Sequence, residues 1–314
     1  MDEKIITSFV VPVYNGSPML AALCKRLAPV GDSYGSYEII FVDDGSMDNS
    51  CNTIMQLQKR FPKICLVQLS RNFGQHNATL AGIAQARGEI VITLDQDLQH
   101  PPEEIHKLVS KLNEGFDVVY GLPEKRPHKI YRNITSTFSK WISRKILSTA
   151  LNGNFSSFRA IRGWVAVEIV RYNSPYIYLD GVISWTTANV GGVVVKNPKS
   201  DFESQYTFIR LITHGINLVV NFSIRPLQVA SVMGFISSLV GLMLAIYIIV
   251  NKLMFNIPVE GWASLMVALL VIGGAQIAFL GLIGEYIGRI LMNSNHAPNY
   301  VIRSIQREVS DHAE

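Results

Sequence analysis

Two long uncharged segments near the C-terminal end constrain the fold of this 314-residue chain more than any other feature. Residues 229–250 and 262–284 contain no Asp, Glu, Lys or Arg. Each is close to the roughly 20 residues that a helix needs to cross the hydrocarbon core of a bilayer. A pair of buried helices in a soluble protein is the alternative, but two uncharged runs of this length favour the membrane. The sequence therefore predicts a transmembrane helical hairpin.

The charges that flank the two segments predict their orientation. The connection 251–261 carries Lys252 as its basic residue, whereas arginines lie beyond the other two ends. Cytoplasmic flanks are enriched in Lys and Arg, so we expect both termini in the cytoplasm. The first residues lack the basic start and apolar core of a signal peptide, so the front domain is expected there too. The expected location is the inner (cytoplasmic) membrane, as a multi-pass protein.

The first 200 residues alternate short apolar runs with segments of helical periodicity. Strands are expected at residues 5–11, 38–42, 64–69, 89–94 and 117–120, and helices at 19–27, 48–59, 75–87 and 102–113. This alternation predicts an α/β domain with a mostly parallel sheet covered by helices on both faces. Ligands of such sheets bind beyond the carboxyl ends of the strands.

Two carboxylates, Asp95 and Asp97, follow the predicted strand 89–94. Acids this close repel each other, and a cation relieves the repulsion. In an extended strand both side chains point the same way, and with Gln99 they offer hard oxygen ligands to one Mg²⁺ or Mn²⁺. Positions would remain for diphosphate oxygens and water. A solvated acidic turn is the alternative.

A second acidic cluster, Asp43 and Asp44, follows the strand 38–42. Its carboxylates can accept hydrogen bonds from a uracil-like base edge or from ribose hydroxyls. Capping of the next helix is the alternative, and both roles are compatible. The loop after the first strand contains Tyr14, whose ring can stack on a base or, alternatively, pack into the core.

Four motifs resemble the family 2 glycosyltransferases of GT-A fold. They are Val11-Pro12-Val13-Tyr14-Asn15, Val42-Asp43-Asp44-Gly45-Ser46, Arg71-Asn72-Phe73-Gly74 and Asp95-Gln96-Asp97-Leu98-Gln99. The paired apolar segments and the sequence Gly284-Glu285-Tyr286-Ile287-Gly288-Arg289 are similar to the polyprenyl-phosphate group of that family. This group includes dolichol-phosphate mannose synthase and undecaprenyl-phosphate glycosyltransferases, and the resemblance extends over nearly the whole chain.

The resemblance implies a GT-A (Rossmann-like) domain followed by interfacial helices and a two-helix transmembrane hairpin. The expected divisions are a cytoplasmic GT-A domain at 1–200, an amphipathic interfacial region at 201–228, the transmembrane helices at 229–284 and a cytoplasmic tail at 285–314. The implied activity is inverting, metal-dependent transfer of a sugar from a nucleotide-sugar, with UDP as our first choice, to a polyprenyl phosphate such as undecaprenyl phosphate.

The motifs and the basic segment, together with the resemblance, assign expected roles to individual residues. The expected metal ligands are Asp95, Asp97 and Gln99. The expected substrate-binding residues are Pro12, Tyr14, Asp43, Asp44, Arg71, Asp95 and Arg132. The expected catalytic residues are Asp97, Arg126 and Arg159. Arg126 and Arg132 lie in a basic segment, 125–149, and an arginine can bind phosphate through two parallel N–H donors. A solvated helix face, or for each arginine a surface salt bridge, is the alternative.

The acceptor side departs from the family pattern. Gly16 stands where the first loop ordinarily has an acid, residues 153–157 lack the expected Asp, and Ser204-Gln205-Tyr206 replaces a Ser-Lys-Tyr pattern. A lipid phosphate, with a second pKa of about 6, is already largely ionised, so it needs positioning more than deprotonation. The missing acid is therefore compatible with a lipid phosphate acceptor. Asp180 and Glu203 are the remaining carboxylates that could act as a base or order a loop over the site.

Two other functions stay open at this point. One is a processive or hydroxyl-acceptor polysaccharide synthase, which usually carries a Gln-x-x-Arg-Trp motif and more helices than this sequence has. The other is a catalytically silent nucleotide-sugar-binding scaffold. A net charge of +4 without a basic stripe argues against a nucleic-acid partner. Glycines at 273, 274 and 281 can pack helices within one chain or in a homo-oligomer.

Overall fold

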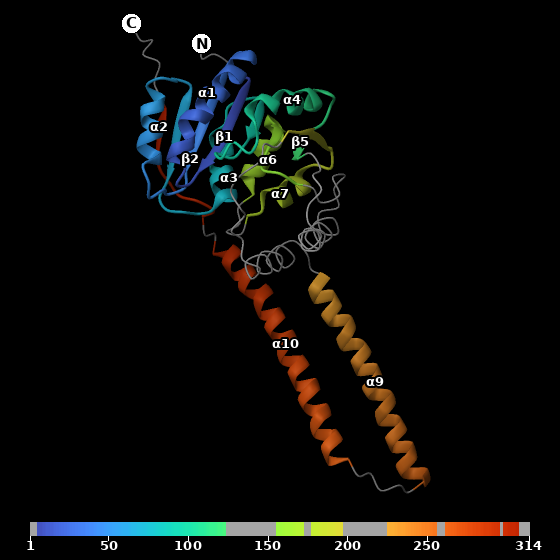
Figure 1. Cartoon of the computed structure of the whole chain (residues 1–314). Helices are drawn as coiled ribbons and strands as arrows, with labels where there is room; N and C mark the ends of the chain where they lie inside the picture. Colours follow the sequence, from blue (N-terminus) through green and yellow to red (C-terminus); the bar gives the residue numbers. More distant parts are fainter. Residues whose placement is uncertain are drawn as a thin grey trace. The chain divides into compact units, whose positions relative to one another are not determined.

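The computed structural model describes residues 5–123, 155–172, 177–196, 225–255, 261–295 and 298–307. The chain divides into two compact units. The first comprises Met1–Gly215 together with His296–Glu314, and the second comprises Ile216–Asn295. Figure 1 shows the described elements as ribbons, and many of them carry labels.

The first unit is built on a mixed sheet whose strand order in the described residues is β7-β5-β6-β4-β1-β2-β3-β8. The strands are β1 (Thr7–Val13), β2 (Tyr37–Asp43), β3 (Ile64–Leu69), β4 (Ile90–Thr93), β5 (Val118–Pro123), β6 (Arg159–Arg162), β7 (Val190–Val195) and β8 (Ile302–Arg307). The pairs β1–β2, β1–β4, β2–β3 and β5–β7 are parallel. Strands β6 and β8 pair antiparallel with their neighbours. The sheet is therefore mostly parallel, as the sequence predicts.

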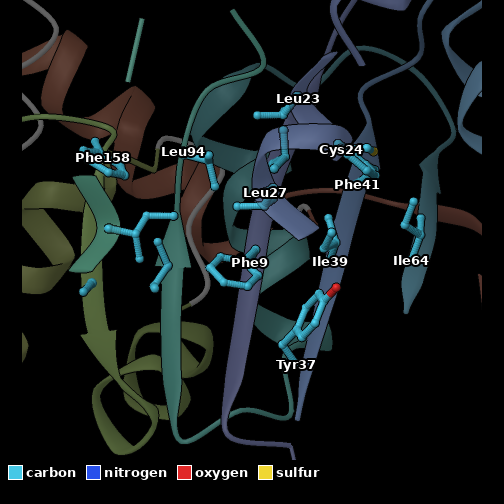
Figure 2. Close-up of a cluster of buried hydrophobic side chains, with 14 of the residues drawn as sticks. Phe9, Leu23, Cys24, Leu27, Tyr37, Ile39, Phe41, Ile64, Leu94 and Phe158 are labelled. Atoms are coloured by element: carbon cyan, nitrogen blue, oxygen red, sulfur yellow. The ribbon is translucent and has the colours of Figure 1, made fainter. Parts of the chain in front are cut away.

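Helices cover both faces of this sheet. They are α1 (Ser17–Ser33), α2 (Ser50–Gln58), α3 (Gln75–Gln85), η1 (Pro102–Glu104), α4 (Ile105–Asn113), α6 (Gly163–Arg171) and α7 (Leu179–Thr186). Side chains alternate between the faces of a strand, so Phe9 and Phe41 enter one core cluster while Val10 and Val42 enter the other. Helices α1, α2 and α4 complete the first cluster, part of which is shown in Figure 2. Helices α3, α6 and α7 complete the second.

The second unit contains two long apolar helices, α9 (Arg225–Phe255) and α10 (Trp262–Ser294). Within them, Leu227–Asn251 and Val271–Gly288 span 25 and 18 residues and are apolar enough to cross a membrane. Their described apolar side chains are mostly exposed, as with Phe235 and Ile277 at 72% each. Exposed apolar surface on this scale is typical of a membrane-facing helix. The two candidate transmembrane helices agree with the predicted hairpin.

The structure divides the last segment differently from the tail expected at 285–314. Helix α10 continues to Ser294, and β8 then joins the sheet beside β3. The amide of Gln58 donates to the carbonyl of Gln306 over 2.9 Å, and Arg307 lies 3.5 Å from the buried carboxylate of Glu38. Pairing with β8 covers an edge of the sheet that would otherwise be open. Part of the expected tail is thus a strand of the first unit.

Candidate functional site

Four loops meet beyond the carboxyl ends of β1, β2, β3 and β4, because these strands are neighbours and parallel. A first cavity of about 300 Å³ opens among them. Its lining includes Pro12, Tyr14, Asp44, Asp95 and Asp97, all of which the sequence analysis places in the site. Asn72 and Gly74 line it as well, so the structure brings residues from all four motifs into one cavity.

The two acids after β2 have different surroundings. Asp44 is 3% exposed, and its two carboxylate oxygens accept hydrogen bonds from the backbone N–H groups of Phe73 (2.7 Å) and Gly74 (2.9 Å). Asp43 is buried, accepts a bond from the N–H of Ser46 (3.2 Å) and does not line the cavity. Burial raises the pKa of both carboxyl groups. Asp44 thus faces the cavity, whereas Asp43 stabilises the turn that carries it.

Gly45 lies where the loop after β2 closely approaches the loop after β3, and a side chain would not fit there. Its φ of 68° is in the left-handed region, and a Cβ there would lie 2.6 Å from the backbone carbon of Arg71. Left-handed geometry alone costs a non-glycine residue about 1–2 kcal/mol. We predict that Gly45→Ala destabilises the protein by more than this, because the added Cβ would also crowd the backbone of Arg71, and that its melting temperature falls accordingly. Gly115→Ala is the matched control, because Gly115 has φ 109° and a Cβ there would meet nothing within 4 Å. Equal shifts in thermal unfolding for the two variants would contradict the crowding argument.

The first loop is tied to the acidic loop by Gln96. Its side-chain amide accepts a bond from the N–H of Tyr14 (3.2 Å) and donates to the carbonyl of the same residue (3.0 Å). A Cβ at Gly16 would collide with the Gln96 side chain. The space beside Gly16, where the resemblance leads us to expect an acid, is therefore occupied by Gln96. The Tyr14 ring is exposed at the cavity, so it does not pack into the core.

Asp95 and Asp97 line the same cavity, but the strand is not extended through them. Strand β4 ends at Thr93, and Leu98 adopts a left-handed conformation with φ 59°. This turn lets the Gln99 N–H donate to Asp97 over 3.0 Å, and the Gln99 side chain is not among those that line the cavity. The extended geometry expected for this segment is thus wrong, although both carboxylates reach one cavity.

The carboxylate pair fits a divalent cation in its chemistry. Burial, with a smaller contribution from the charge of Asp95, raises the pKa of Asp97, which shows the repulsion that a cation would relieve. Among the described residues no group of three or more His, Cys, Asp or Glu side chains is placed to hold a metal ion. The described residues therefore supply two carboxylates at this cavity, Asp95 and Asp97.

A second cavity, of about 230 Å³, adjoins the first and shares Asp95 and Gln75 with it. Arg159 on β6 lines it, is 3% exposed and donates through Nη1 to Asp180 over 2.5 Å. The Tyr120 hydroxyl donates to the same carboxylate oxygen over 2.9 Å. Within the described part of the chain, the Arg159 Nε has no hydrogen-bond partner. Arg159 thus forms a buried ion pair, in place of the surface salt bridge considered as its alternative.

His100 is a feature of this region that the sequence analysis does not single out. Its ring stacks on Phe158, with centroids 5.1 Å apart and planes 11° apart, and its buried Nδ1 lacks a partner among the described residues. Burial lowers the pKa of His100. The stack packs the acidic loop against the residue that precedes Arg159. The only sequence signal for this contact is the position of His100 directly after Gln99.

Several predicted residues lie elsewhere or outside the described ranges. The exposed side chain of Arg71 lies over the Phe73 ring, 4.8 Å from its centroid, and does not line either cavity. Arg126, Arg132 and Glu203 fall outside the described residues. So does most of the predicted interfacial region 201–228, of which residues 225–228 begin α9.

Two models of known protein families match the sequence of this chain. The sequence profile described as Glycosyl transferase family 2 matches residues 8–166, which is just over half of the chain. The chain belongs to glycosyl transferase family 2. A second profile, the GtrB C-terminal hairpin, matches residues 225–290 and so includes α9 and most of α10. This family 2 glycosyltransferase therefore combines a nucleotide-sugar transferase domain with a hairpin found in a polyprenyl-phosphate glycosyltransferase family, as the sequence resemblance indicates.

Two solved structures of low identity, with TM-scores of 0.50 and 0.52, share the GT-A fold of this glycosyltransferase. Glucosyl-3-phosphoglycerate synthase from Mycobacterium tuberculosis, in complex with Mn²⁺, UDP-glucose and phosphoglyceric acid, is 15% identical with a TM-score of 0.52, covering 69% of this chain and 78% of that chain. The same enzyme with phosphoglyceric acid is 17% identical with a TM-score of 0.50, covering 69% and 80%. S. aureus TarS 1-349 in complex with UDP-GlcNAc is 18% identical with a TM-score of 0.45, covering 69% and 67%.

Proposed function

We propose that this family 2 glycosyltransferase transfers a sugar, with inversion, from a UDP-sugar to a polyprenyl phosphate such as undecaprenyl phosphate. The observation that carries the proposal is the pair of adjoining cavities, one with two carboxylates and the other with a buried arginine, in a chain that also has a GtrB-type hairpin. Two substrates must meet in a single displacement, and two cavities that share a wall suit that requirement.

The nucleotide-sugar is assigned to the first cavity. Asp44 offers carboxylate oxygens to the nucleoside, and the exposed Tyr14 ring offers a stacking surface beside Pro12. Asp43 supports this side by stabilising the turn, and Arg71, which does not line the cavity, is proposed as a further substrate-binding residue. A uridine nucleotide is our first choice.

Asp95 and Asp97 would hold Mg²⁺ or Mn²⁺, and Gln99 would contribute through its backbone bond to Asp97. The hard oxygen ligands and their mutual repulsion support this assignment. An ion bound there would offset the charge that grows on the leaving diphosphate. The mycobacterial synthase was solved with Mn²⁺ and UDP-glucose, which supports the same ligand class for a protein of this fold.

The acceptor phosphate is assigned to the second cavity. The Arg159 Nε there lacks a hydrogen-bond acceptor within the described part of the chain, and a phosphate oxygen would supply one. Arg126 and Arg132 are proposed as further phosphate ligands from the basic segment. Asp180 is engaged by Arg159 and Tyr120, so it orders the cavity and is not our candidate for a general base.

The chain connectivity supports an even number of membrane crossings. Residues before and after the hairpin belong to one compact unit, because β8 pairs with β3. A hairpin that crosses twice returns the chain to the side of the membrane from which it entered. This is required because β8, which follows the hairpin, pairs with β3, which precedes it. The arginines that flank the outer ends of the two helices favour the cytoplasmic side of the inner membrane for the catalytic domain and both termini.

The proposed function predicts a lipid-linked product. Full-length protein in detergent is incubated with Mn²⁺, radiolabelled UDP-sugars and undecaprenyl phosphate, and the label is partitioned between organic and aqueous phases. Label should enter the organic phase with the wild type and stay aqueous with Asp97→Ala. Label on an oligosaccharide would instead indicate a polysaccharide synthase, and nucleotide binding without turnover would indicate a scaffold.

A further inference from the structure

Both oxygens of the Asp95 carboxylate are already engaged by side chains distant in sequence. Gln75, at the start of α3, donates through Nε2 to Oδ1 over 2.6 Å. Ser157, just before β6, donates through Oγ to Oδ2 over 2.5 Å. The carboxylate therefore bridges two separate elements, and neither contact belongs to the acidic motif itself.

The two donors are themselves anchored. The carbonyl of Ser157 accepts a bond from Thr93 Oγ1 over 2.6 Å, which ties this loop to the end of β4. The carbonyl of Gln75 accepts one from Thr79 Oγ1 over 2.8 Å, within α3. Ser157 and Gln75 are thus held by the sheet and by a helix, and they can fix the orientation of Asp95.

This bridge lies on the boundary between the two cavities. Asp95 and Gln75 line both, whereas Ser157 lines the second cavity and not the first. The neighbouring Ser156 also lines the second cavity, but its Oγ accepts a bond from the N–H of Phe158 over 3.2 Å. Two adjacent serines in one cavity therefore have different partners.

We propose that Gln75 and Ser157 are positioning residues that hold Asp95 in its metal-binding orientation, with Ser157 acting from the acceptor cavity. The inference rests on the proposed function. A carboxylate has about four lone-pair sites, so two donors leave about two for an ion. Because Gln75 and Ser157 fix the side-chain rotamer of Asp95 before the ion binds, less conformational entropy is lost on binding. Groups that orient a metal ligand in this way typically change metal affinity about 10–100-fold when they are removed.

Mn²⁺ binding to the full-length protein, titrated in detergent with UDP present, tests the inference. Ser157→Ala and Gln75→Ala should each raise the Kd for Mn²⁺ about 10–100-fold. Ser156→Ala is the matched control and should stay within about twofold of wild type. Ser157→Thr keeps a hydroxyl and should restore binding. A second readout is the dependence of transfer on Mn²⁺: kcat in Ser157→Ala should recover at high Mn²⁺.

The remaining outcomes of these measurements distinguish failure of the inference from failure of the proposed function. Wild-type Mn²⁺ affinity in Ser157→Ala and Gln75→Ala would overturn the inference, and so would equal losses in Ser156→Ala and Ser157→Ala. If the wild type binds no Mn²⁺, the inference and the metal dependence of the proposed function both fail. If the wild type and variants bind Mn²⁺ as expected but no label reaches the lipid, the acceptor assignment fails and the positioning roles stand.

Discussion

Asp97→Asn should lower kcat/KM for sugar transfer at least about 10³-fold, which corresponds to about 4 kcal/mol of transition-state stabilisation. The change removes one charge from the carboxylate pair in the first cavity while keeping the shape of the side chain. The Gln99 N–H can still donate to its remaining oxygen, so the loop turn at Leu98 should persist. What is lost is the charge that would hold a divalent ion beside the leaving diphosphate.

The control for this variant is an acid of the same type far from the cavities. Asp32 is ion-paired with Lys63 over 3.5 Å, and its side chain is 65% exposed. Asp32→Asn should leave both Mn²⁺ affinity and transfer close to wild type, because exposed pairs of this kind contribute about 1 kcal/mol or less. Mn²⁺ titration separates binding from chemistry. Full activity of Asp97→Asn at ordinary Mn²⁺ concentrations would rule out the metal role of this pair.

The sequence predicts most of the sheet because β1 to β5 are local apolar runs. The segment 64–69 matches β3 in full, and the other predicted strands differ from the observed ones at their ends. Strand β6 is not predicted, since Arg159–Arg162 is short and has an arginine at each end. It is a strand because β4 and β5 enclose it. Strand β8 pairs with a segment more than two hundred residues earlier, a contact that no local pattern encodes.

As for the sheet, the sequence predicts those parts of the site whose residues are close together in the chain, and it does not predict the contacts between distant residues. Proximity in sequence predicts that Asp95 and Asp97 share a cavity, but the left-handed Leu98 between Asp97 and Gln99 is not visible in the motif. The partners of Asp95 lie 20 and 62 residues away, at Gln75 and Ser157. Their positions follow from how α3 and β6 pack on the sheet. Motifs therefore identify the reactive groups, whereas tertiary packing determines which side chains orient them.

Asp180→Ala should have the largest effect on stability, because it leaves the guanidinium of Arg159 buried without its counter-charge. Breaking such a pair typically costs about 3–5 kcal/mol. The Tyr120 hydroxyl would lose its acceptor as well. At about 2–4 °C per kcal/mol for a domain of this size, the apparent melting temperature should fall by roughly 6–20 °C. Glu168→Ala is the control: it removes an ion pair with Arg171 whose partners are 43% and 70% exposed, and should shift melting little.

A combined variant separates the stability of this cluster from its chemistry. Replacing a buried ion pair by apolar side chains of similar volume is often neutral or stabilising. Tyr120→Phe, Arg159→Met and Asp180→Leu together should therefore recover most of the melting temperature lost in Asp180→Ala. If Arg159 binds the acceptor phosphate, this folded variant should still bind UDP but show a raised KM for undecaprenyl phosphate. A stable variant with an unchanged KM for the lipid would mean that the pair has only a structural role, and that the acceptor phosphate is bound by other residues.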